Sequence, residues 1–397
     1  MDGSQVNSLD HCLKCSTCHT QCPVVANYVA FPGPKQLGPE LERLRLAKGE
    51  QLPPAIDKSL DYCTNCKRCD LACPHGVKPA YYNMKNKARV KGAALKSFRD
   101  WVLAHNGWWG AIGRRFPALL NLVLKLPLTK TAMKIAGFAP RDFPGYQKQT
   151  IRIKKFKKTR KILYYPGCYA SCNEPEIMQA AVDILQAYGY QVEIAPAGCC
   201  GTPLISNGLL AEARRSAVKN TEIFLDYIHQ GYQVVTTCSS CGLALKEEYP
   251  LLNPGPKSNA LREKVWDLFE LLPEEEDEPF LQDQIKIAKA YYHVPCHLKA
   301  QGIGTPAGRL LTKYAVHRLI VADSYCCGIA GTYGFKKEKY SLAMEIGSPL
   351  FKDIREQNVP LVITDCGTCK LQITQGTGVP VRHPAVVLKK YLELADL

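Results

Sequence analysis

The chain has 397 residues, 46% of them hydrophobic and 22% charged, which allows two or three folded domains and excludes an intrinsically disordered chain. Its 19 cysteines suit either disulfides in an oxidising compartment or metal in a reducing one, and residues 1–10 lack the basic start and apolar run of a secretory signal. We therefore expect a cytoplasmic protein with reduced, metal-binding thiols.

Residues 1–84 contain two cysteine runs of the form C-x-x-C-x-x-C-x-x-x-C-P. In bacterial two-cluster ferredoxins the first three cysteines of such a run bind one [4Fe-4S] cluster and the fourth binds the other. The forty residues between the runs exceed what a compact ferredoxin needs, and they favour a helical two-cluster domain that resembles the iron–sulfur subunits of fumarate reductase. The predicted ligands are Cys12, Cys15, Cys18 and Cys73 for one cubane cluster and Cys63, Cys66, Cys69 and Cys22 for the second.

Two zinc sites are the alternative for these eight cysteines. Zinc takes four ligands in two C-x-x-C pairs, so the remaining cysteines of each run would have no role, and iron–sulfur clusters are favoured. Asn65, Lys67 and Arg68 stand inside the second run. They either tune the potential of its cluster or are solvated surface groups.

Residues 85–160 form a basic segment, because they hold 19 Lys and Arg but only two acids, Asp100 and Asp142. This segment carries a charge of +17, while the rest of the chain carries −2, which together give the net charge of +15. No recognition motif for nucleic acid accompanies the charge, which argues against a nucleic-acid partner.

The basic segment also contains three tryptophans and an apolar run at residues 116–128. This run is interrupted by Lys125 and Pro127 and is shorter than the ~20 apolar residues that a membrane-spanning helix needs. Tryptophans flanked by cations favour instead a helix that lies in the interface of an anionic membrane. A docking surface for an acidic partner and a merely solvated face are the alternatives. The tryptophans are Trp101, Trp108 and Trp109.

From residue 161 the chain repeats itself, with residues 161–290 as one repeat and 291–397 as the other. Five cysteines recur at offsets of 127 or 128 residues, which indicates a duplication. Cys172 has Ala300 as its counterpart and is therefore predicted not to be a ligand. The recurring cysteines are Cys168, Cys199, Cys200, Cys238 and Cys241 in repeat 1 and Cys296, Cys326, Cys327, Cys366 and Cys369 in repeat 2.

Each repeat has the pattern of a βαβαβ unit. Apolar residues at helical spacing, such as Ile177, Ile184 and Leu185, predict helices with one buried face. The cysteines follow predicted strands, and ligands bind at that edge of an open α/β sheet. The fold class is α+β multidomain, a helical two-cluster ferredoxin domain followed by two α/β cysteine-rich repeats. In repeat 1 we predict strands at 161–165, 191–195 and 233–237 and helices at 174–188 and about 209–229.

Five thiolates per repeat are one more than a cubane cluster requires. Either a cubane forms beside a free reactive thiol, or an unusual cluster has irons bridged by thiolates. We find no G-x-G-x-x-G loop, since Gly302 and Gly304 do not open a helix in that arrangement, so a flavin or nicotinamide on this chain has no support. Clusters move single electrons, and removal of a hydride from an alcohol therefore belongs to a partner.

The whole chain resembles the family of iron–sulfur subunits of anaerobic glycerol-3-phosphate dehydrogenase, through motifs at residues 31–36, 42–45, 199–204 and 326–337. Its repeats resemble the cysteine-rich domains of the heterodisulfide reductase catalytic subunit and of the iron–sulfur subunits of glycolate and lactate oxidases. In heterodisulfide reductase, five such cysteines hold a non-cubane [4Fe-4S] cluster. Some members of the glycerol-3-phosphate dehydrogenase family lack one cysteine of the first repeat's C-x-x-C, whereas this chain has both Cys238 and Cys241.

The resemblance implies an iron–sulfur electron-transfer subunit of an oxidoreductase, with two cubane clusters and one or two further, non-cubane ones. It also implies an FAD-containing dehydrogenase partner, menaquinone as acceptor, and a peripheral position on the cytoplasmic side of the inner membrane. Rival functions are a heterodisulfide or disulfide reductase-type catalytic subunit, the iron–sulfur subunit of a glycolate or lactate oxidase, and a non-catalytic membrane anchor.

Three further side chains have alternative roles. His297, directly after Cys296, either gives protons to a reduced quinone, as a catalytic residue, or donates a hydrogen bond to a cluster sulfur. Lys336 and Lys337 either attract an anionic acceptor or are ordinary exposed charges.

Overall fold

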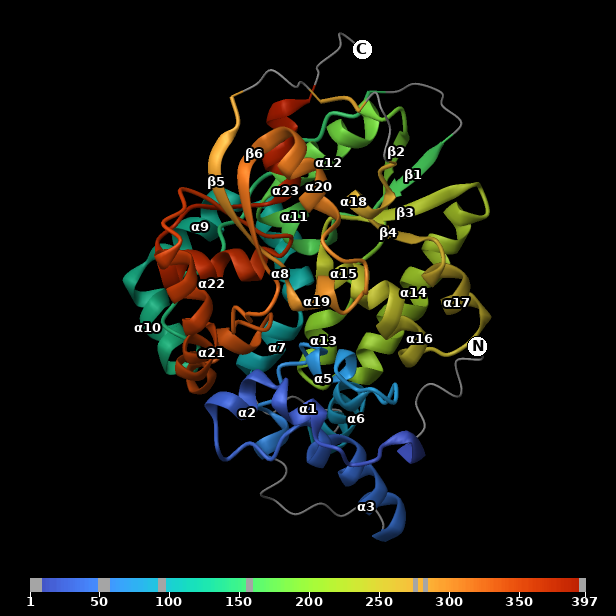
Figure 1. Cartoon of the computed structure of the whole chain (residues 1–397), viewed down its shortest axis with the longest axis vertical. Coiled ribbons are helices and arrows are strands. Elements are labelled where there is room, and N and C mark those ends of the chain that lie inside the picture. Colours follow the sequence, from blue (N-terminus) through green and yellow to red (C-terminus); the bar gives the residue numbers. More distant parts are fainter. Residues whose placement is uncertain are drawn as a thin grey trace.

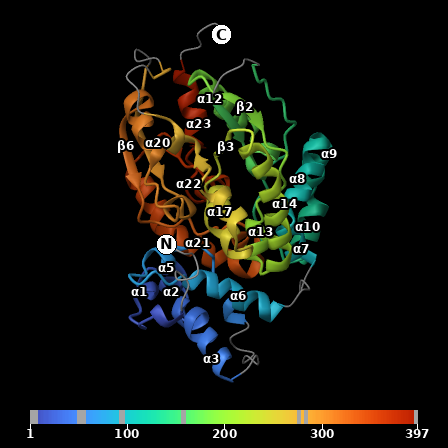
Figure 2. The same cartoon turned by 90° about the vertical axis from the view of Figure 1, so that its right-hand side faces the viewer.

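The computed structural model describes residues 9–48, 58–91, 98–154, 160–273, 278–280 and 285–392. The polar start at residues 1–8 and the lysines Lys155, Lys157 and Lys158 of the basic segment lie outside the described residues. A helical N-terminal region forms one end of the molecule, and the two repeats stand side by side above it (Figure 1). Figure 2 shows that helices of the basic segment run along one side of the repeats.

The N-terminal region is helical, as predicted, and its described residues contain no strand. Val24, Phe31, Leu37 and Leu41 belong to its small core, which continues into repeat 2 through Leu342 and three further buried side chains. The N-terminal region is therefore packed directly onto repeat 2. Its elements are η1 (Leu9–His11), α1 (Thr17–Thr20), α2 (Pro23–Asn27), the π-helix η2 (Gln36–Glu40), α3 (Leu41–Lys48), α5 (Arg68–Leu71) and α6 (Pro79–Lys91).

Residues 98–154 of the basic segment form four short helices, and its residues 85–91 belong to α6. Pro117 and Pro127 each start a new helix, because proline suits the first helical turn and cannot continue a preceding one. The apolar run is thereby divided between two helices, and among the described residues no helix is long and apolar enough to cross a membrane. The helices are α7 (Phe98–Ala104), α8 (Asn106–Arg115), α9 (Pro117–Lys125) and α10 (Pro127–Ile135).

The repeats contain two four-stranded sheets of identical topology, β2-β1-β3-β4 and β6-β5-β7-β8, in which all neighbouring strands are parallel. The shared order confirms the duplication as a duplication of fold. Each sheet has a fourth strand beyond the three predicted. The strands are β1 (Lys161–Tyr164), β2 (Gln191–Ile194), β3 (Tyr232–Thr236) and β4 (Val265–Asp267), and then β5 (Ile287–His293), β6 (Val316–Ala322), β7 (Val362–Ile363) and β8 (Val381–Arg382).

The long helices cover these sheets with their predicted apolar faces. Ile177 and Ile184 of α12 (Pro175–Ala187) are buried, as are Ile346 and Leu350 of α21 (Lys337–Glu356). One hydrophobic core contains residues of both repeats, so the two sheets fold together. The other helices of repeat 1 are α11 (Gly167–Cys172), α13 (Thr202–Ser206), α14 (Leu210–Ile228), α15 (Ser239–Leu243), the π-helix η3 (Ala244–Glu248), α16 (Tyr249–Leu252), α17 (Pro256–Arg262) and α18 (Leu268–Leu271). Those of repeat 2 are α19 (Cys296–Lys299), α20 (Pro306–Leu310), the π-helix η4 (Leu311–Ala315), η5 (Tyr333–Phe335), α22 (Gly367–Thr377), α23 (Pro384–Leu388) and η6 (Lys389–Tyr391).

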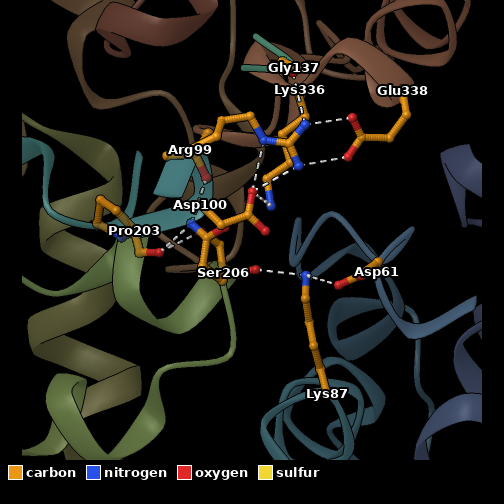
Figure 3. Close-up of polar contacts among 11 residues, drawn as sticks. Asp61, Lys87, Arg99, Asp100, Gly137, Pro203, Ser206, Lys336 and Glu338 are labelled. Carbon is orange, nitrogen blue, oxygen red and sulfur yellow. Dashed lines mark hydrogen bonds and ion pairs between the residues drawn. The ribbon is translucent and has the colours of Figure 1, made fainter. Parts of the chain in front are cut away.

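Buried charges join the basic segment to repeat 2 (Figure 3). Asp100 of α7 accepts ion pairs from Arg99 at 2.9 Å and from Lys336 at 3.1 Å, and all three side chains are largely buried. Arg99 also pairs with Glu338 at 2.7 Å. Lys336 is therefore engaged inside the protein and is not the exposed anion-attracting group that the sequence suggested as one alternative.

A second polar contact in the same view joins the N-terminal region to repeat 1. Lys87 of α6 donates a hydrogen bond to the backbone oxygen of Ser206 at 2.8 Å and lies 3.8 Å from the carboxylate of Asp61. The basic charge of residues 85–160 is thus partly used to hold the regions of the chain together.

Candidate iron–sulfur site

The eight cysteines of the N-terminal region line two cavities. Burial, followed by the nearby thiols of Cys12, Cys73 and Cys15, raises the pKa of Cys18 to about 11. In the second cavity burial and the thiols of Cys66 and Cys63 raise the pKa of Cys22 to about 12. Four converging thiolates repel each other unless a cation lies among them, so these donor sets fit a metal cluster. Cys12, Cys15, Cys18 and Cys73 line the first cavity, and Cys22, Cys63, Cys66 and Cys69 line the second.

Both cysteine runs adopt the same unusual backbone. Lys14 and Ser16 in the first run, and Asn65 and Lys67 at the equivalent positions of the second, have φ angles of 59°, 67°, 53° and 63°. Such left-handed conformations cost non-glycine residues about 1–2 kcal/mol each. Strain that recurs at equivalent positions around cysteines is expected where the backbone has to wrap a bound group.

In repeat 1 the five recurring cysteines converge at the carboxyl edge of the sheet, as the strand positions predicted. Cys168 follows β1, Cys199 and Cys200 follow β2, and Cys238 and Cys241 follow β3. Hydrogen bonds from Cys199 and Cys241 lower the pKa of Cys200 well below its ordinary value, while contacts with Cys168 and Cys200 raise that of Cys199. The five thiols thus form one continuous cluster of sulfur atoms.

The equivalent cysteines of repeat 2 also come together. The Sγ atoms of Cys327 and Cys369 are 3.2 Å apart, and a hydrogen bond from Cys369 lowers the pKa of Cys366 to about 7. Burial and the neighbouring thiols of Cys326 and other cysteines raise the pKa of Cys296. This donor set is buried and rich in sulfur, which suits iron–sulfur binding.

The second cysteine run docks against both repeats. Cys66 is among the thiols that raise the pKa of both Cys296 and Cys326, so the second N-terminal cavity lies beside the cysteines of repeat 2. Lys67 is not a solvated charge. It is 5% exposed and forms an ion pair of 2.7 Å with the buried Glu248 of η3 in repeat 1.

His297 lies where these three cysteine sites meet. Its Nδ1 lies 2.9 Å from the hydroxyl of Ser240 and its Nε2 lies 3.1 Å from the backbone oxygen of Asn65. Burial lowers the pKa of His297. The histidine therefore connects repeat 2, repeat 1 and the second cysteine run, and its role as a proton donor stays a prediction.

Comparison with known proteins agrees with this arrangement. Residues 8–77 match the family described as a 4Fe-4S dicluster domain, and residues 162–246 and 290–374 each match the family described as a cysteine-rich domain. The anaerobic glycerol-3-phosphate dehydrogenase of Escherichia coli K12 has a subunit, designated C, that is 36% identical over 97% of this chain and 99% of that protein. The chain belongs to the family of this glycerol-3-phosphate dehydrogenase subunit.

More distant relatives also match along almost the whole chain. The glycolate oxidase iron-sulfur subunit of Escherichia coli K12 is 25% identical, over 96% of this chain and 94% of that protein. The dihydromethanophenazine:CoB–CoM heterodisulfide reductase of Methanosarcina barkeri has a subunit, designated D, that is 24% identical over 94% of this chain and 90% of that protein. This member of the glycerol-3-phosphate dehydrogenase family is thus an iron–sulfur electron-transfer subunit of an oxidoreductase.

Helix α8 of this subunit lies over repeat 1. The sequence did not predict this contact. A Cβ atom on Gly107 would lie 2.8 Å from the Cβ of Cys199, and one on Gly110 would lie 2.9 Å from the Sγ of Cys172. Cys172 is buried one helical turn after Cys168, and burial raises its pKa to about 11. Glycine at these positions lets the helix approach the cysteines closely.

One side chain in the repeat 2 site was missed. His293, the last residue of β5, has a ring nitrogen that lies with the Sγ atoms of Cys327 and Cys369 inside a span of 4.8 Å. The spacing His293-x-x-Cys296 at the end of a strand was the available signal. It was overlooked because repeat 1 has no histidine at the corresponding place.

Proposed function

We propose that this protein passes electrons from an FAD-containing dehydrogenase, most directly an anaerobic glycerol-3-phosphate dehydrogenase, to menaquinone at the cytoplasmic face of the inner membrane. The observation that carries the proposal is the adjacency of the second N-terminal cavity and the repeat cysteines. Sites that exchange electrons have to lie close together. The full-length similarity to a glycerol-3-phosphate dehydrogenase subunit supports the choice of partner.

The cysteines fit two cubane [4Fe-4S] clusters in the N-terminal region and a further, non-cubane cluster in each repeat. Bound clusters would supply one-electron redox chemistry. The protein supplies the thiolates and buries some of them fully, such as those of Cys66, Cys69 and Cys327. The ligands we propose are the two sets of four cysteines in the N-terminal cavities and the five recurring cysteines of each repeat.

The three sites are held together by contacts of this chain's own residues. The Lys67–Glu248 ion pair is buried on both sides, and Gln301 donates hydrogen bonds to the backbone oxygens of Ser239 and His297. Breaking a buried pair by removal of one partner costs about 3–5 kcal/mol, so these contacts fix the relative position of the cysteine loops.

Helices α9 and α10 supply a surface suited to the membrane interface. Leu119, Leu122, Leu128 and Ile135 are each more than half exposed, and neither helix has a buried residue. Exposed Lys125 lies among them. An amphipathic surface of this kind inserts its apolar side chains at headgroup depth while its cations contact anionic lipid.

Quinone reduction and metal content test the proposal together. Anaerobically purified protein should contain about sixteen irons if all four sites hold four irons each. With reduced dye as donor it should reduce a water-soluble menaquinone analogue, and Cys327→Ser should remove both that activity and about four irons. About eight irons in fully reconstituted protein would confine clusters to the N-terminal region. Turnover of a thiol heterodisulfide without quinone reduction would assign the function to the disulfide reductase alternative.

A further inference from the structure

His293 is an imidazole aimed into the cysteine site of repeat 2. It ends β5, pairs in register with Ala322 of β6, and is 1% exposed. A ring nitrogen of His293 and the Sγ atoms of Cys327 and Cys369 all lie within 4.8 Å of one another. One metal ion can contact three donor atoms gathered so closely, and imidazole nitrogen and thiolate sulfur are both ligands for iron.

The Nδ1 atom of His293 is buried and unpaired among the residues that the structure describes, while the ring as a whole forms a side-chain hydrogen bond with the thiol of Cys327 that helps lower the pKa of that thiol. A buried polar atom without a partner costs about 1–3 kcal/mol. Nearly all buried polar atoms in folded proteins are satisfied, so an unpaired Nδ1 on a ring that already contacts Cys327 supports a bound group in this site.

Repeat 1 lacks this nitrogen. The duplication offset of 128 residues places Tyr165 opposite His293. The hydroxyl of Tyr165 donates a hydrogen bond to the backbone oxygen of Gly198 at 2.7 Å and is therefore already engaged. The two repeats keep the same five cysteines but differ at this position, so their sites are chemically unequal.

We propose that His293 is a nitrogen ligand of the iron centre in repeat 2, beside Cys327 and Cys369. The proposal rests on the proposed function in one respect, that repeat 2 holds an iron–sulfur cluster. A nitrogen donor in addition to the five recurring cysteines makes the repeat 2 site chemically different from that of repeat 1, so the reduction potentials of the two sites should differ.

Pulsed electron paramagnetic resonance of the full chain tests this directly. The signal of the repeat 2 centre is defined as the one lost in Cys327→Ser. In protein made with natural histidine that signal should show the coupling of a directly bound ¹⁴N, and it should change to the ¹⁵N pattern when only histidine is ¹⁵N-labelled. This comparison needs no substitution and carries no risk of misfolding.

Three variants identify the histidine. The coupling should vanish in His293→Gln and persist in His297→Gln, which removes the neighbouring imidazole. The midpoint potential of the repeat 2 signal should shift in His293→Gln, which removes the nitrogen donor, and stay unchanged in the matched repeat 1 variant Tyr165→Phe.

The outcomes separate this inference from the function on which it rests. A repeat 2 signal without histidine coupling, with only the weak coupling of a hydrogen-bonded ring, or with a coupling that survives His293→Gln overturns the ligand role and leaves the cluster in place. If Cys327→Ser removes neither a signal nor iron, repeat 2 holds no cluster, and the proposed function fails at the same point.

Discussion

Asp100 and Asp142 are the two acids of the strongly basic segment, and they have opposite surroundings. The Asp100 side chain is 9% exposed between Arg99 and Lys336, whereas that of Asp142 is 89% exposed beside Lys130. Removing one partner of a buried ion pair leaves an uncompensated charge, while a surface pair contributes little. Asp100 therefore has a structural role, whereas Asp142 in the same segment has almost none.

We predict that Asp100→Asn lowers the free energy of unfolding by about 3 kcal/mol, because Arg99 and Lys336 then lose the carboxylate between them. Asp142→Asn is the matched control and should change stability by less than about 0.5 kcal/mol. Denaturant unfolding of both variants checks this. Equal stabilities would mean that Glu338 and backbone groups already compensate the two cations.

We predict that His383 makes the folding stability depend on pH. Its Nδ1 accepts a hydrogen bond from the Ala385 N–H at 3.1 Å, and its Nε2 lies 3.0 Å from the backbone oxygen of Thr237, so the neutral ring satisfies both. Burial lowers its pKa from 6.5 to about 4, despite the opposing hydrogen bond to Thr237. The folded state thus disfavours the charged ring, and its stability is complete above pH 6.5 and declines as the pH falls toward 4.

Between about pH 7.5 and 5.5 this one group should therefore cost about 1 kcal/mol of folding stability. His383→Gln keeps a donor for Thr237 but cannot titrate, so the variant should lose less stability over the same range. Unfolding midpoints of both proteins at the two pH values provide the measurement. An identical pH dependence in the variant would exclude His383 as the titrating group.

The cysteine ligand candidates could be predicted residue by residue, whereas the side chains that connect their sites could not. The spacing of the two runs was enough to predict which four cysteines line each N-terminal cavity. Each cavity is lined by three cysteines of one run and the fourth cysteine of the other. The sequence did not decide whether Lys67 tunes a cluster or is a solvated charge, since its partner Glu248 is 181 residues away in the sequence. His293 was not predicted because repeat 1 has no histidine at the corresponding place.

At the scale of elements, the glycines of helix α8 allow this helix to pack closely against repeat 1. Gly110→Ala would place its new Cβ 2.9 Å from the Sγ and 3.3 Å from the Cβ of Cys172. We predict a loss of about 1–3 kcal/mol from overpacking, with displacement of α8 from repeat 1. Adding Cys172→Ala removes the clashing sulfur and should recover most of that loss in thermal unfolding.

The single variant Cys172→Ala has its own expected result. Because its counterpart in repeat 2 is Ala300, Cys172 is predicted not to bind iron, and the variant should retain the full iron content of the protein. The iron content of the Cys172→Ala protein, measured beside its thermal unfolding, checks this prediction. A loss of about four irons would make Cys172 a ligand and would break the equivalence of the two repeats.

Long elements were predictable and short ones were not. Helix α12 and strands β1, β2 and β3 lie within a residue or two of their predicted bounds, because each has enough residues for its apolar period to be visible. Strands β4 and β8 have three and two residues, too few for any period. They form because β3 and β7 have edges with which they can pair. These edges exist only in the assembled sheet, so the local sequence does not indicate them.

In the whole molecule, the N-terminal region and the exposed apolar helices of the basic segment lie on different sides. The N-terminal region occupies one end, and helices α8–α10 lie along the flank of the repeats (Figure 2). Asn121 of α9 exchanges two hydrogen bonds of 2.8 Å with the backbone of Tyr146, and Met133 of α10 packs against the core of repeat 2. These contacts fix the inner side of the two helices, so their leucines face outward. Under the proposed function, a dehydrogenase bound at the N-terminal end would leave this flank open to a membrane.

Vesicle binding tests the membrane side of this arrangement. Leu122→Ser with Leu128→Ser removes two side chains that are 60% and 80% exposed. If each contributes about 1 kcal/mol by insertion, affinity for anionic vesicles should fall roughly thirty-fold. Val29→Ser with Leu46→Ser, which removes similarly exposed apolar side chains from the N-terminal region, is the matched control and should bind like the unaltered chain. Binding should also weaken with salt, because charge attraction is screened beyond about 8 Å at physiological ionic strength. If both double variants bind alike, the hairpin of α9 and α10 is not the membrane surface, and a partner protein becomes the better occupant of its exposed leucines.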